Sequence, residues 1–242
     1  MCAGRSLGTR SGGAVFVKTK IAMNLAYLFP RRVEKAADGN IVLDWEGQFP
    51  FGVPWQEQHN DALPYPRVLP NCLSAQECAN IVTLGERRLI SAASVEGRSD
   101  LQSRDYRVSD IAWIEPAEDS HWLYHRLGLL FGYLNETYNF ELVGLGESLQ
   151  YTCYGPEQFF NWHIDNGAGG ASLRKLSLTI QLSEPDEYAG GELEFHGVNE
   201  MPNARGLGSA ICFPSFLAHR VRPVQSGLRR SLVAWAYGPV YR

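Results

Sequence analysis

From residue 141 onward the chain consists of short segments rich in β-branched and aromatic residues, separated by Gly, Pro and Asn. The six segments are ELVGLGESLQYTCY, KLSLTIQLS, GELEFHG, GSAICFP, AHRVRPV and RRSLVAWAYG. Strands of this length with turn residues between them are typical of an all-β sandwich or barrel. This half of the chain therefore predicts a mainly β fold.

The segment KLSLTIQLS indicates what the two faces of such a sheet contact. Leucine and isoleucine at 176, 178, 180 and 182 alternate with Ser177, Thr179 and Gln181. Because successive strand residues point to opposite faces, one face packs on the core and the other faces polar surroundings. A polar lumen lined by strands is a candidate ligand cavity.

The residues before 141 predict two helices and one strand. A helix over 73–89 begins with Ser74 and Glu77, which form a capping-box pair. A second helix, over 118–138, carries one apolar stripe made of Leu123, Leu127, Leu130 and Leu134. Residues 106–114 read as a strand. We expect an α+β, mainly β domain in which both helices pack against one sheet.

Length and composition predict one domain with an N-terminal extension. The 242 residues are 45% hydrophobic and 20% charged, which fits a globular chain with one core. Residues 1–60 lack periodicity, so we place the extension at 1–60 and the domain at 61–242. Seven basic residues precede residue 36, against Glu34 as the single acid, and are typical of a solvated tail or of a binding arm.

The net charge, the apolar segments and the cysteines argue against nucleic-acid binding, membrane association and disulfides. The net charge of −4 and pI near 5.9 give no overall attraction to nucleic acid. IAMNLAYLF, residues 21–29, is too short to span a bilayer, and no membrane association is expected. The five cysteines form no Cys-x-x-Cys pair, so neither disulfides nor a thiolate zinc site is predicted and a cytoplasmic location is expected.

A His-x-Asp pair, His163 and Asp165, lies in FFNWHIDNGAGG between aromatic residues and glycines. With six histidines and 26 acidic residues this spacing alone carries little information, and His59-Asn60-Asp61 repeats it in a Pro-rich stretch that we interpret as surface. His219, in a later strand-like segment, can complete a set of two imidazoles and one carboxylate. Such a set leaves three positions open on iron, as in non-haem Fe(II) oxygenases, whereas each histidine alone would be read as structural.

Arg229 and Ser231 follow on the next strand and suit a planar carboxylate, because a guanidinium donates two parallel hydrogen bonds. A surface ion pair is the alternative interpretation of Arg229, and Arg230 is a competing candidate. The strand period decides between them: if Ser231 and Trp235 face the lumen with Arg229, then Arg230 faces away.

Residues 141–237 resemble the prolyl-4-hydroxylase branch of the Fe(II)/2-oxoglutarate dioxygenases, and bacterial PKHD-type hydroxylases most of all. The resemblance lies in QYTCYGPEQFFNWHID, LSLTIQLSEPDEYAGGELEF and FPSFLAHRVRPVQSGLRRSLVAW, and a weaker similarity extends back to about residue 72. It implies a double-stranded β-helix, or jelly-roll, core.

The resemblance also implies roles for particular residues. His163, Asp165 and His219 would bind Fe(II), Arg229 would pair with the distal carboxylate of 2-oxoglutarate, and Tyr154 and Gln181 would contact that cosubstrate with Ser231. A plain core aromatic is the alternative interpretation of Tyr154, and Gln181 stands where prolyl hydroxylases often have Tyr. Because Asp165 is retained, hydroxylation rather than halogenation is expected.

The implied activity is hydroxylation of an unactivated C–H bond with O2, releasing succinate and CO2, with ascorbate as a candidate reductant. The substrate is a prolyl or other protein residue, or a free amino acid-like small molecule. The alternative is a non-catalytic jelly-roll binding or sensor protein. Two further features stay open. The segment with Gly167, Gly169 and Gly170 is either a mobile loop over the site or a plain strand connection. Arg220 and Arg222 either bind an acidic group of the substrate or lie on a solvated strand edge.

Overall fold

The computed structural model describes residues 60–89, 105–199, 201 and 204–241, together with the backbone of four short strands before residue 60. Contacts divide the chain into two units, Met1–His59 and Asn60–Arg242. In the first unit, β1 (Leu25–Ala26) pairs with β4 (Val53–Pro54), and β2 (Arg32–Lys35) pairs with β3 (Ile41–Asp44). The second unit contains all the predicted site residues.

The second unit contains a large antiparallel sheet in the spatial order β5-β14-β11-β17-β9-β7, with β8 beside β17. Its strands are β5 (Arg67–Leu69), β7 (Asp110–Ile114), β8 (Gly144–Leu145), β9 (Leu149–Tyr154), β11 (Arg174–Gln181), β14 (Ala210–Pro214) and β17 (Arg229–Tyr237). The two central strands, β11 and β17, come from the segments with the clearest strand pattern in the sequence.

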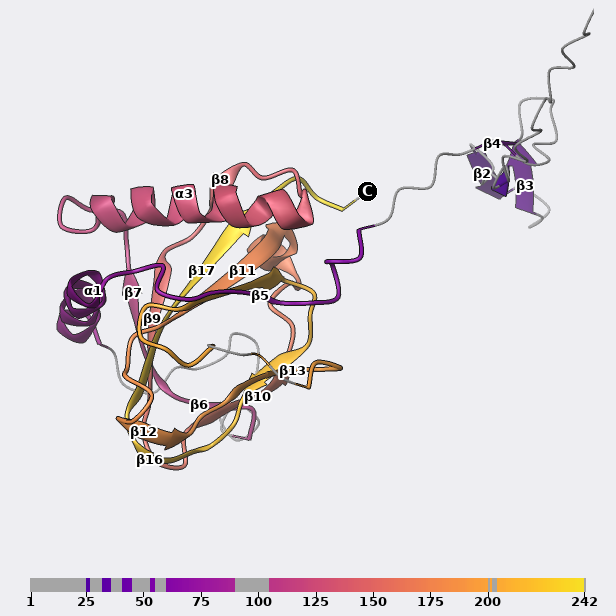
Figure 1. Ribbon diagram of the computed structural model, residues 1–242. Coiled ribbons are helices and arrows are strands. Elements are labelled where there is room, and N and C mark those ends of the chain that lie inside the picture. The colour runs from indigo at the N-terminus through magenta and orange to yellow at the C-terminus, as the bar shows by residue number, and fades with distance from the viewer. Residues whose placement is uncertain are drawn as a thin grey trace, which may run out of the picture. The chain divides into compact units, whose positions relative to one another are not determined.

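A small sheet lies on the other side of the lumen, in the order β13-β15-β10-β6 (Figure 1). Its strands are β6 (Arg107–Val108), β10 (Phe159–His163), β13 (Leu193–Phe195) and β15 (His219–Val221). A separate ribbon pairs β12 (Tyr188–Gly190) with β16 (Val224–Gly227). The predicted double-stranded β-helix core is confirmed, with strands of both sheets alternating along the chain.

Strand register explains why the large sheet has one apolar and one polar face. On β11, Leu178 lies opposite Ala234 of β17, and these residues belong to the apolar core under the helices. Thr179, one position along, lies opposite Val233, which in turn lies opposite Gln150 of β9. These three residues line the lumen, so the predicted alternation in KLSLTIQLS is confirmed.

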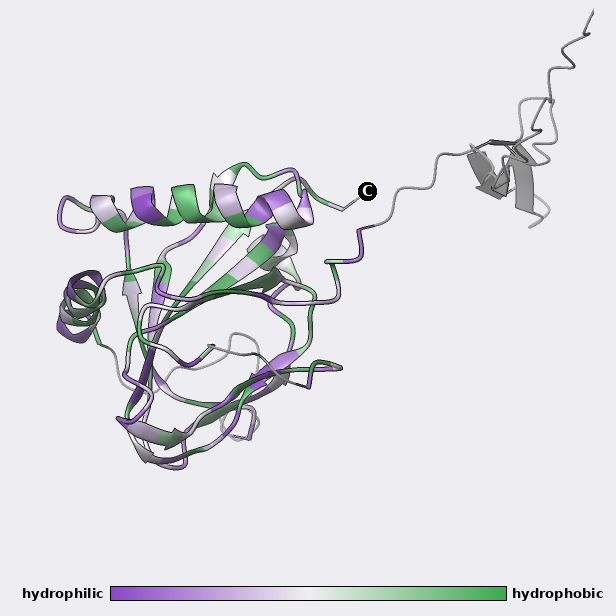
Figure 2. Cartoon of the chain, in the orientation of Figure 1, coloured by the Kyte–Doolittle hydropathy of each residue, from purple (hydrophilic) through white to green (hydrophobic). Residues whose placement is uncertain are grey.

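Both helices cover the apolar face of the large sheet, as predicted (Figure 1). Helix α1 (Ala75–Arg87) begins with the predicted capping box, in which Ser74 and Glu77 satisfy each other's backbone N–H groups. The inward side of α1 is mostly apolar and its outward side hydrophilic (Figure 2). Gly85 lies directly against the ring of buried Tyr151, so α1 approaches the sheet more closely than a side chain would allow.

Helix α3 (His121–Tyr138) buries all four leucines of its predicted stripe. It ends at Asn139, which adopts a left-handed conformation. The amide of Asn60 donates a hydrogen bond to the carbonyl of Tyr138 at 2.9 Å, so this member of the second His-x-Asp sequence caps a helix terminus. Asp61 is exposed, and no described helix is long and apolar enough to cross a membrane.

Two parts of the fold differ from the sequence-based expectation. The Pro-rich LPYPRVLP contains the edge strand β5, which pairs with β14; prolines on either side are tolerated because an edge strand needs hydrogen bonds on one side only. The expected strand 106–114 is interrupted at Ser109. Its first part, β6, joins the small sheet and its second part, β7, joins the large one, so this segment crosses between the two sheets.

Candidate active site

His163, Asp165 and His219 meet where β10 and β15 pair in the small sheet. His163 ends β10 and lies opposite His219, which begins β15. The Nε2 atoms of both histidines lie 3.7 Å from the Asp165 carboxylate, each nearest a different oxygen. One ligand atom from each residue falls within 4.8 Å of the others, and all three side chains are less than 10% exposed. The predicted ligand set is therefore assembled.

Hydrogen bonds to the backbone leave both imidazoles able to bind a metal. The Nδ1 of His163 lies 2.8 Å from the carbonyl of Asn161, and that of His219 lies 2.9 Å from the carbonyl of Leu217. When Nδ1 donates to a carbonyl, the proton is held there and the lone pair is on Nε2, which faces Asp165. Burial, with His219 beside it, lowers the pKa of His163 to about 3, so this ring is neutral near pH 7.

The Asp165 carboxylate completes the site as its only anionic ligand. Burial raises its pKa, but His219, His163 and the Ser177 hydroxyl together outweigh burial and lower it. Its Oδ2 atom is buried without a hydrogen-bond partner. A buried oxygen of this kind calls for a counterpart, and a divalent metal held by two imidazole nitrogens and one carboxylate satisfies it. The residues present therefore fit an Fe(II) ion.

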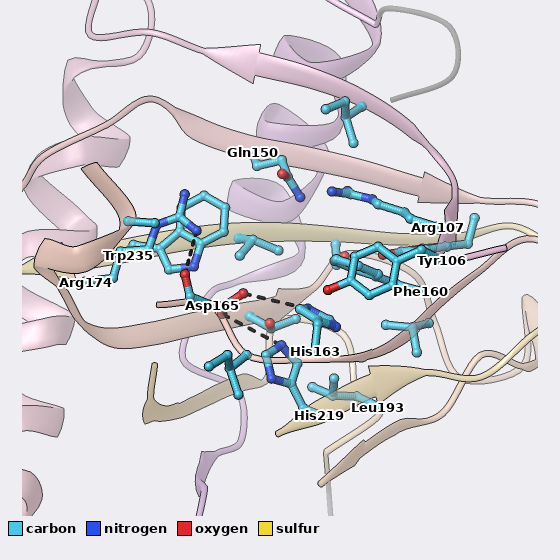
Figure 3. A pocket seen from close by; sticks show the side chains of 18 of the residues that line it. Tyr106, Arg107, Gln150, Phe160, His163, Asp165, Arg174, Leu193, His219 and Trp235 are labelled. Carbon is cyan, nitrogen blue, oxygen red and sulfur yellow. Dashed lines mark hydrogen bonds and ion pairs between the residues drawn. The ribbon is translucent and has the colours of Figure 1, made fainter. Parts of the chain in front are cut away.

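The three residues line a cavity of about 330 Å³ between the two sheets. Figure 3 shows Asp165, His163 and His219 on one side of it and Gln150 and Arg107 on the other. Strands of both sheets contribute, since Phe160 comes from the small sheet and Thr179 from the large one. Ala171, in the 3-10 helix η1 (Gly169–Leu173), adds a loop to the wall; mobility of that loop stays a prediction.

Arg229, at the start of β17, also lines this cavity and lacks a partner for most of its donors. The residue is 1% exposed, and its Nε and Nη2 atoms have no hydrogen-bond partner. Its Nη1 donates to the hydroxyl of Ser231 over 3.4 Å, and its guanidinium lies 5.4 Å from the centre of the Tyr154 ring. A buried cation with free donors is costly unless an anion binds to it, so Arg229 marks an anion-binding point.

Gly191 makes the space that the Arg229 side chain occupies. It has a positive φ of 65°, and a Cβ added there would lie 3.0 Å from Cδ of Arg229 and 2.9 Å from Cγ2 of Val224. Gly190 ends β12, and Gly191 lies between β12 and β13 beside the anion-binding arginine.

The other candidate residues lie in different places. Ser231, Trp235 and Tyr154 line the cavity with Arg229, whereas Arg230 faces away and pairs with Glu86 of α1 at 3.4 Å, as the strand period predicts. Gln181 is not among the cavity's lining residues. It lines a neighbouring cavity of about 220 Å³ with Tyr188 and Gly191.

Arg220 and Arg222 do not reach the cavity either. Both pair with Glu194 of the neighbouring strand β13, at 2.7 and 3.5 Å, and Arg220 also lies over the ring of Trp162. The acidic partner of both arginines is thus Glu194 of the small sheet.

Sequence reasoning missed two arginines of the site. Arg174 donates to both carboxylate oxygens of Glu147 at 2.6 Å, to the carbonyl of Asp165 at 3.0 Å, and stacks on Trp235 at 3.9 Å. Arg107 enters from β6 on the opposite wall. Arg174 precedes KLSLTIQLS, where the strand pattern could have placed it near a strand end, but no sequence signal distinguishes Arg107.

Comparison with known proteins finds a family whose profile matches the part of the chain that contains this site. The family profile described as the 2OG-Fe(II) oxygenase superfamily matches residues 149–237, from the first residue of β9 to the last of β17. This segment resembles the 2OG-Fe(II) oxygenase superfamily. The matched segment includes His163, Asp165, His219 and Arg229, and it leaves out Arg107.

Two curated relatives of the oxygenase segment are bacterial. A PKHD-type hydroxylase from Synechococcus elongatus is 38% identical over 93 residues, which is 36% of this chain and 42% of the relative. A PKHD-type hydroxylase from Hyphomonas neptunium is 43% identical over 89 residues, 35% of this chain and 40% of that one. The chain thus spans less than half the length of these relatives.

Solved structures of oxygenases share the fold over a longer stretch. A Pseudomonas putida prolyl-4-hydroxylase covers 72% of this chain and 92% of its own, with a TM-score of 0.57 and 21% identity. A prolyl hydroxylase from Trichoplax adhaerens, solved with a hypoxia-inducible-factor peptide, covers 71% and 83% with a TM-score of 0.57 and 16% identity. These likenesses support the double-stranded β-helix.

Proposed function

We propose that this protein is an Fe(II)- and 2-oxoglutarate-dependent hydroxylase. The observation that carries the proposal is Arg229, a fully buried guanidinium with two unpaired nitrogens in the same cavity as the His163-Asp165-His219 set. The metal set alone would suit many proteins. A buried, unpaired cation beside it calls for a ligand that reaches both, and 2-oxoglutarate carries a chelating 2-oxo acid at one end and a carboxylate at the other.

When bound, iron and 2-oxoglutarate supply O2 activation: one oxygen atom enters the new C–O–H group, and the other enters succinate as 2-oxoglutarate is oxidised and loses CO2. The chain's own residues hold these groups. His163, Asp165 and His219 would bind the metal, Arg229 and Ser231 would bind the distal carboxylate, and the Tyr154 ring would pack beside it. Arg229, Ser231 and Tyr154 are themselves buried, and the low dielectric of buried surroundings strengthens a charge interaction at that end of the cavity.

The backbone of Asp165 is fixed from two sides. Its N–H donates to the carbonyl of Ser215 at 2.9 Å, and its carbonyl accepts from Arg174 at 3.0 Å. The bidentate Glu147 pair in turn holds Arg174. Arg174 is therefore a positioning residue that keeps the carboxylate turned toward the two imidazoles.

The test is an anaerobic titration of the metal-free protein with Fe(II) and then 2-oxoglutarate, following the visible charge-transfer band of a chelated 2-oxo acid. Arg229→Ala should raise the Kd for 2-oxoglutarate about 30-fold or more, because losing one partner of a buried charge pair costs roughly 2–5 kcal/mol. Arg230→Ala is the matched control, since Arg230 is the chain neighbour of Arg229 and faces α1. The Kd of this variant for 2-oxoglutarate should stay unchanged.

His163→Ala should lose both iron retention and succinate formation. Absence of the band in the unaltered protein, or equal Kd values for the Arg229 and Arg230 variants, would contradict the proposal. A metal- and 2-oxoglutarate-binding protein that releases no succinate under O2 with any substrate would instead be a binding or sensor protein.

The substrate is a prolyl or other protein residue, or a small amino acid-like molecule. Solved structures with this fold include a viral collagen prolyl hydroxylase, and the Trichoplax adhaerens enzyme was solved with a peptide. Both names suggest peptide substrates for those proteins, whereas a cavity of about 330 Å³ that must also hold 2-oxoglutarate suits a small molecule.

A further inference from the structure

A second arginine in the cavity lacks a partner. Arg107, on β6, is 9% exposed, and its Nη2 atom is buried without a hydrogen-bond partner. Its Nε donates to the hydroxyl of Ser109 at 2.8 Å, which is a neutral acceptor. No carboxylate among the described residues forms an ion pair with it. A guanidinium buried in this way needs an anion, and the described residues supply none.

Aromatic stacking places Arg107 near the metal ligands. The guanidinium lies 4.6 Å from the centre of the Phe160 ring, and Phe160 stacks on His163 with ring centres 3.5 Å apart. Arg107 and Phe160 are also paired across β6 and β10. The cation is thus one ring away from a metal ligand, while Arg229 lies against Tyr154 on the large sheet.

Among the described charged residues of the cavity, Arg107 is the one without an opposite charge. The charged lining residues of the cavity are Asp165, Arg107, Arg174 and Arg229. Glu147 neutralises Arg174 through a bidentate pair. Under the proposed function, Asp165 and the two carboxylates of 2-oxoglutarate balance the ferrous ion and Arg229, so among the described residues one positive charge, on Arg107, stays without a counterpart.

We infer that Arg107 binds a free carboxylate of the substrate, and that the substrate is a small carboxylic acid of about amino-acid size. The inference rests on the proposed function. Because the guanidinium is nine-tenths buried, the carboxylate must enter the cavity with the reacting carbon, so it belongs to a short molecule and not to the middle of a polypeptide. Phe160, Ile111 and Trp113 offer apolar walls for the rest of that molecule.

The experiment measures succinate release by the chain of residues 1–242 with Fe(II), saturating 2-oxoglutarate and O2. The probes are the free L-amino acids and short straight-chain and arylalkyl monocarboxylic acids, each beside its carboxamide. At least one acid should raise succinate release more than tenfold over its own carboxamide. A proline-containing tetrapeptide, with a free or an amidated C-terminus, tests whether a peptide can supply the carboxylate instead.

Arg107→Gln should reduce the acid-to-carboxamide ratio to near one, because a neutral amide binds the two probes alike. Arg107→Lys, which keeps the charge but not the fork, should retain part of the preference. Arg222→Gln is the control for loss of a positive charge outside the cavity, and it should leave the ratio unchanged. A ratio compares two probes on one protein, so a partly unfolded sample does not change it.

The 2-oxoglutarate band separates this inference from the proposed function. A band that is normal in Arg107→Gln, together with a lost preference for acids, supports a substrate-binding arginine. If Arg107→Gln loses the band, Arg107 serves the cosubstrate and the inference is wrong. It is also wrong if no acid stimulates succinate release, or if the carboxamides stimulate it as well as the acids do. A peptide result contradicts it too: either the amidated peptide stimulates release, or the peptide with a free C-terminus is the only probe that does. No band in the unaltered protein defeats the proposed function itself.

Discussion

At the residue scale, the arginines of this fold differ in what their neighbours offer. Arg174 has Glu147, Arg220 has Glu194 and Arg230 has Glu86, all from adjacent elements. Arg229 and Arg107 are more buried than these, and among the described residues each donates a hydrogen bond only to a serine hydroxyl. An arginine without a carboxylate inside the protein is thus a more informative mark of a ligand than an arginine in a cavity as such.

Gly191→Ala should weaken 2-oxoglutarate binding without a change to any ligand-contacting side chain. The new methyl group would press on Cδ of Arg229 at 3.0 Å, and the positive φ adds strain for any L-residue. We expect the Kd for 2-oxoglutarate to rise roughly tenfold, because moving Cδ misaligns the guanidinium and weakens a charged hydrogen bond worth about 1.5–3 kcal/mol.

Gly197→Ala is the matched control. Gly197 has a similar φ of 80°, but a Cβ there would have no neighbour within 4 Å. Both variants should lose similar stability from backbone strain, and only Gly191→Ala should change the charge-transfer titration. An unchanged Kd in Gly191→Ala would show that Arg229 tolerates displacement or does not bind the cosubstrate.

The sequence predicted the candidate metal set but not all the arginines of the cavity. His163, Asp165 and His219 could be proposed because a metal site requires particular residue types, and strand period predicts which of them share a face. Arg107 could not be found, since its importance lies in the absence of an ion-paired carboxylate among the described residues. That absence depends on how β6 crosses to the small sheet, which no local pattern specifies.

At the scale of elements, α1 depends on a glycine where it meets the sheet. Gly85→Ala would overlap the ring of Tyr151, which is fully buried and has no room to move. Overpacking of a core costs about 1–3 kcal/mol, more than the gain in helix propensity of up to about 1 kcal/mol. We expect a lower urea midpoint, measured by circular dichroism.

Gly128→Ala, in the middle of α3, should do the opposite. Gly128 is exposed and has open space around its Cβ position, so alanine adds only helix propensity, worth about 0.5–1 kcal/mol. A lower midpoint for Gly128→Ala, or a higher one for Gly85→Ala, would contradict this account of the two helix faces.

Elements with a repeated pattern were predicted better than those defined by their partners. The stripe of α3 and the alternation in β11 follow from burial of one face, and both faces are as expected. Edge strand β5 was missed because its prolines suppress the strand pattern while its pairing with β14 is set by the tertiary fold. The break at Ser109 was missed because no Gly, Pro or Asn marks it in the sequence, although the chain changes sheets there.

At the scale of the whole molecule, the unit Asn60–Arg242 should fold and bind its ligands alone. Every residue of the cavity, both sheets and both helices lie within it. A chain beginning at Asn60 should therefore keep the charge-transfer band with an unchanged Kd, and it retains the Asn60 amide that caps α3.

A chain beginning at Ala75 is the comparison. It lacks β5 and the capping residue Ser74, which exposes the edge of β14 and removes a helix cap worth about 1 kcal/mol. It should be less stable and prone to aggregation. Loss of the band in the chain from Asn60 would mean that residues before it contribute to the site.

The metal set and Arg229 lie on opposite sheets, and this has a mechanical consequence. His163 and His219 are held by the small sheet, and Arg229 by the large one. A cosubstrate that chelates the metal and pairs with Arg229 would connect the small sheet to the large one. Under the proposed function, turnover would replace this cosubstrate by succinate, which is one carbon shorter because the carboxyl group next to the oxo carbon is lost. The product would therefore connect the two sheets less firmly than the reactant.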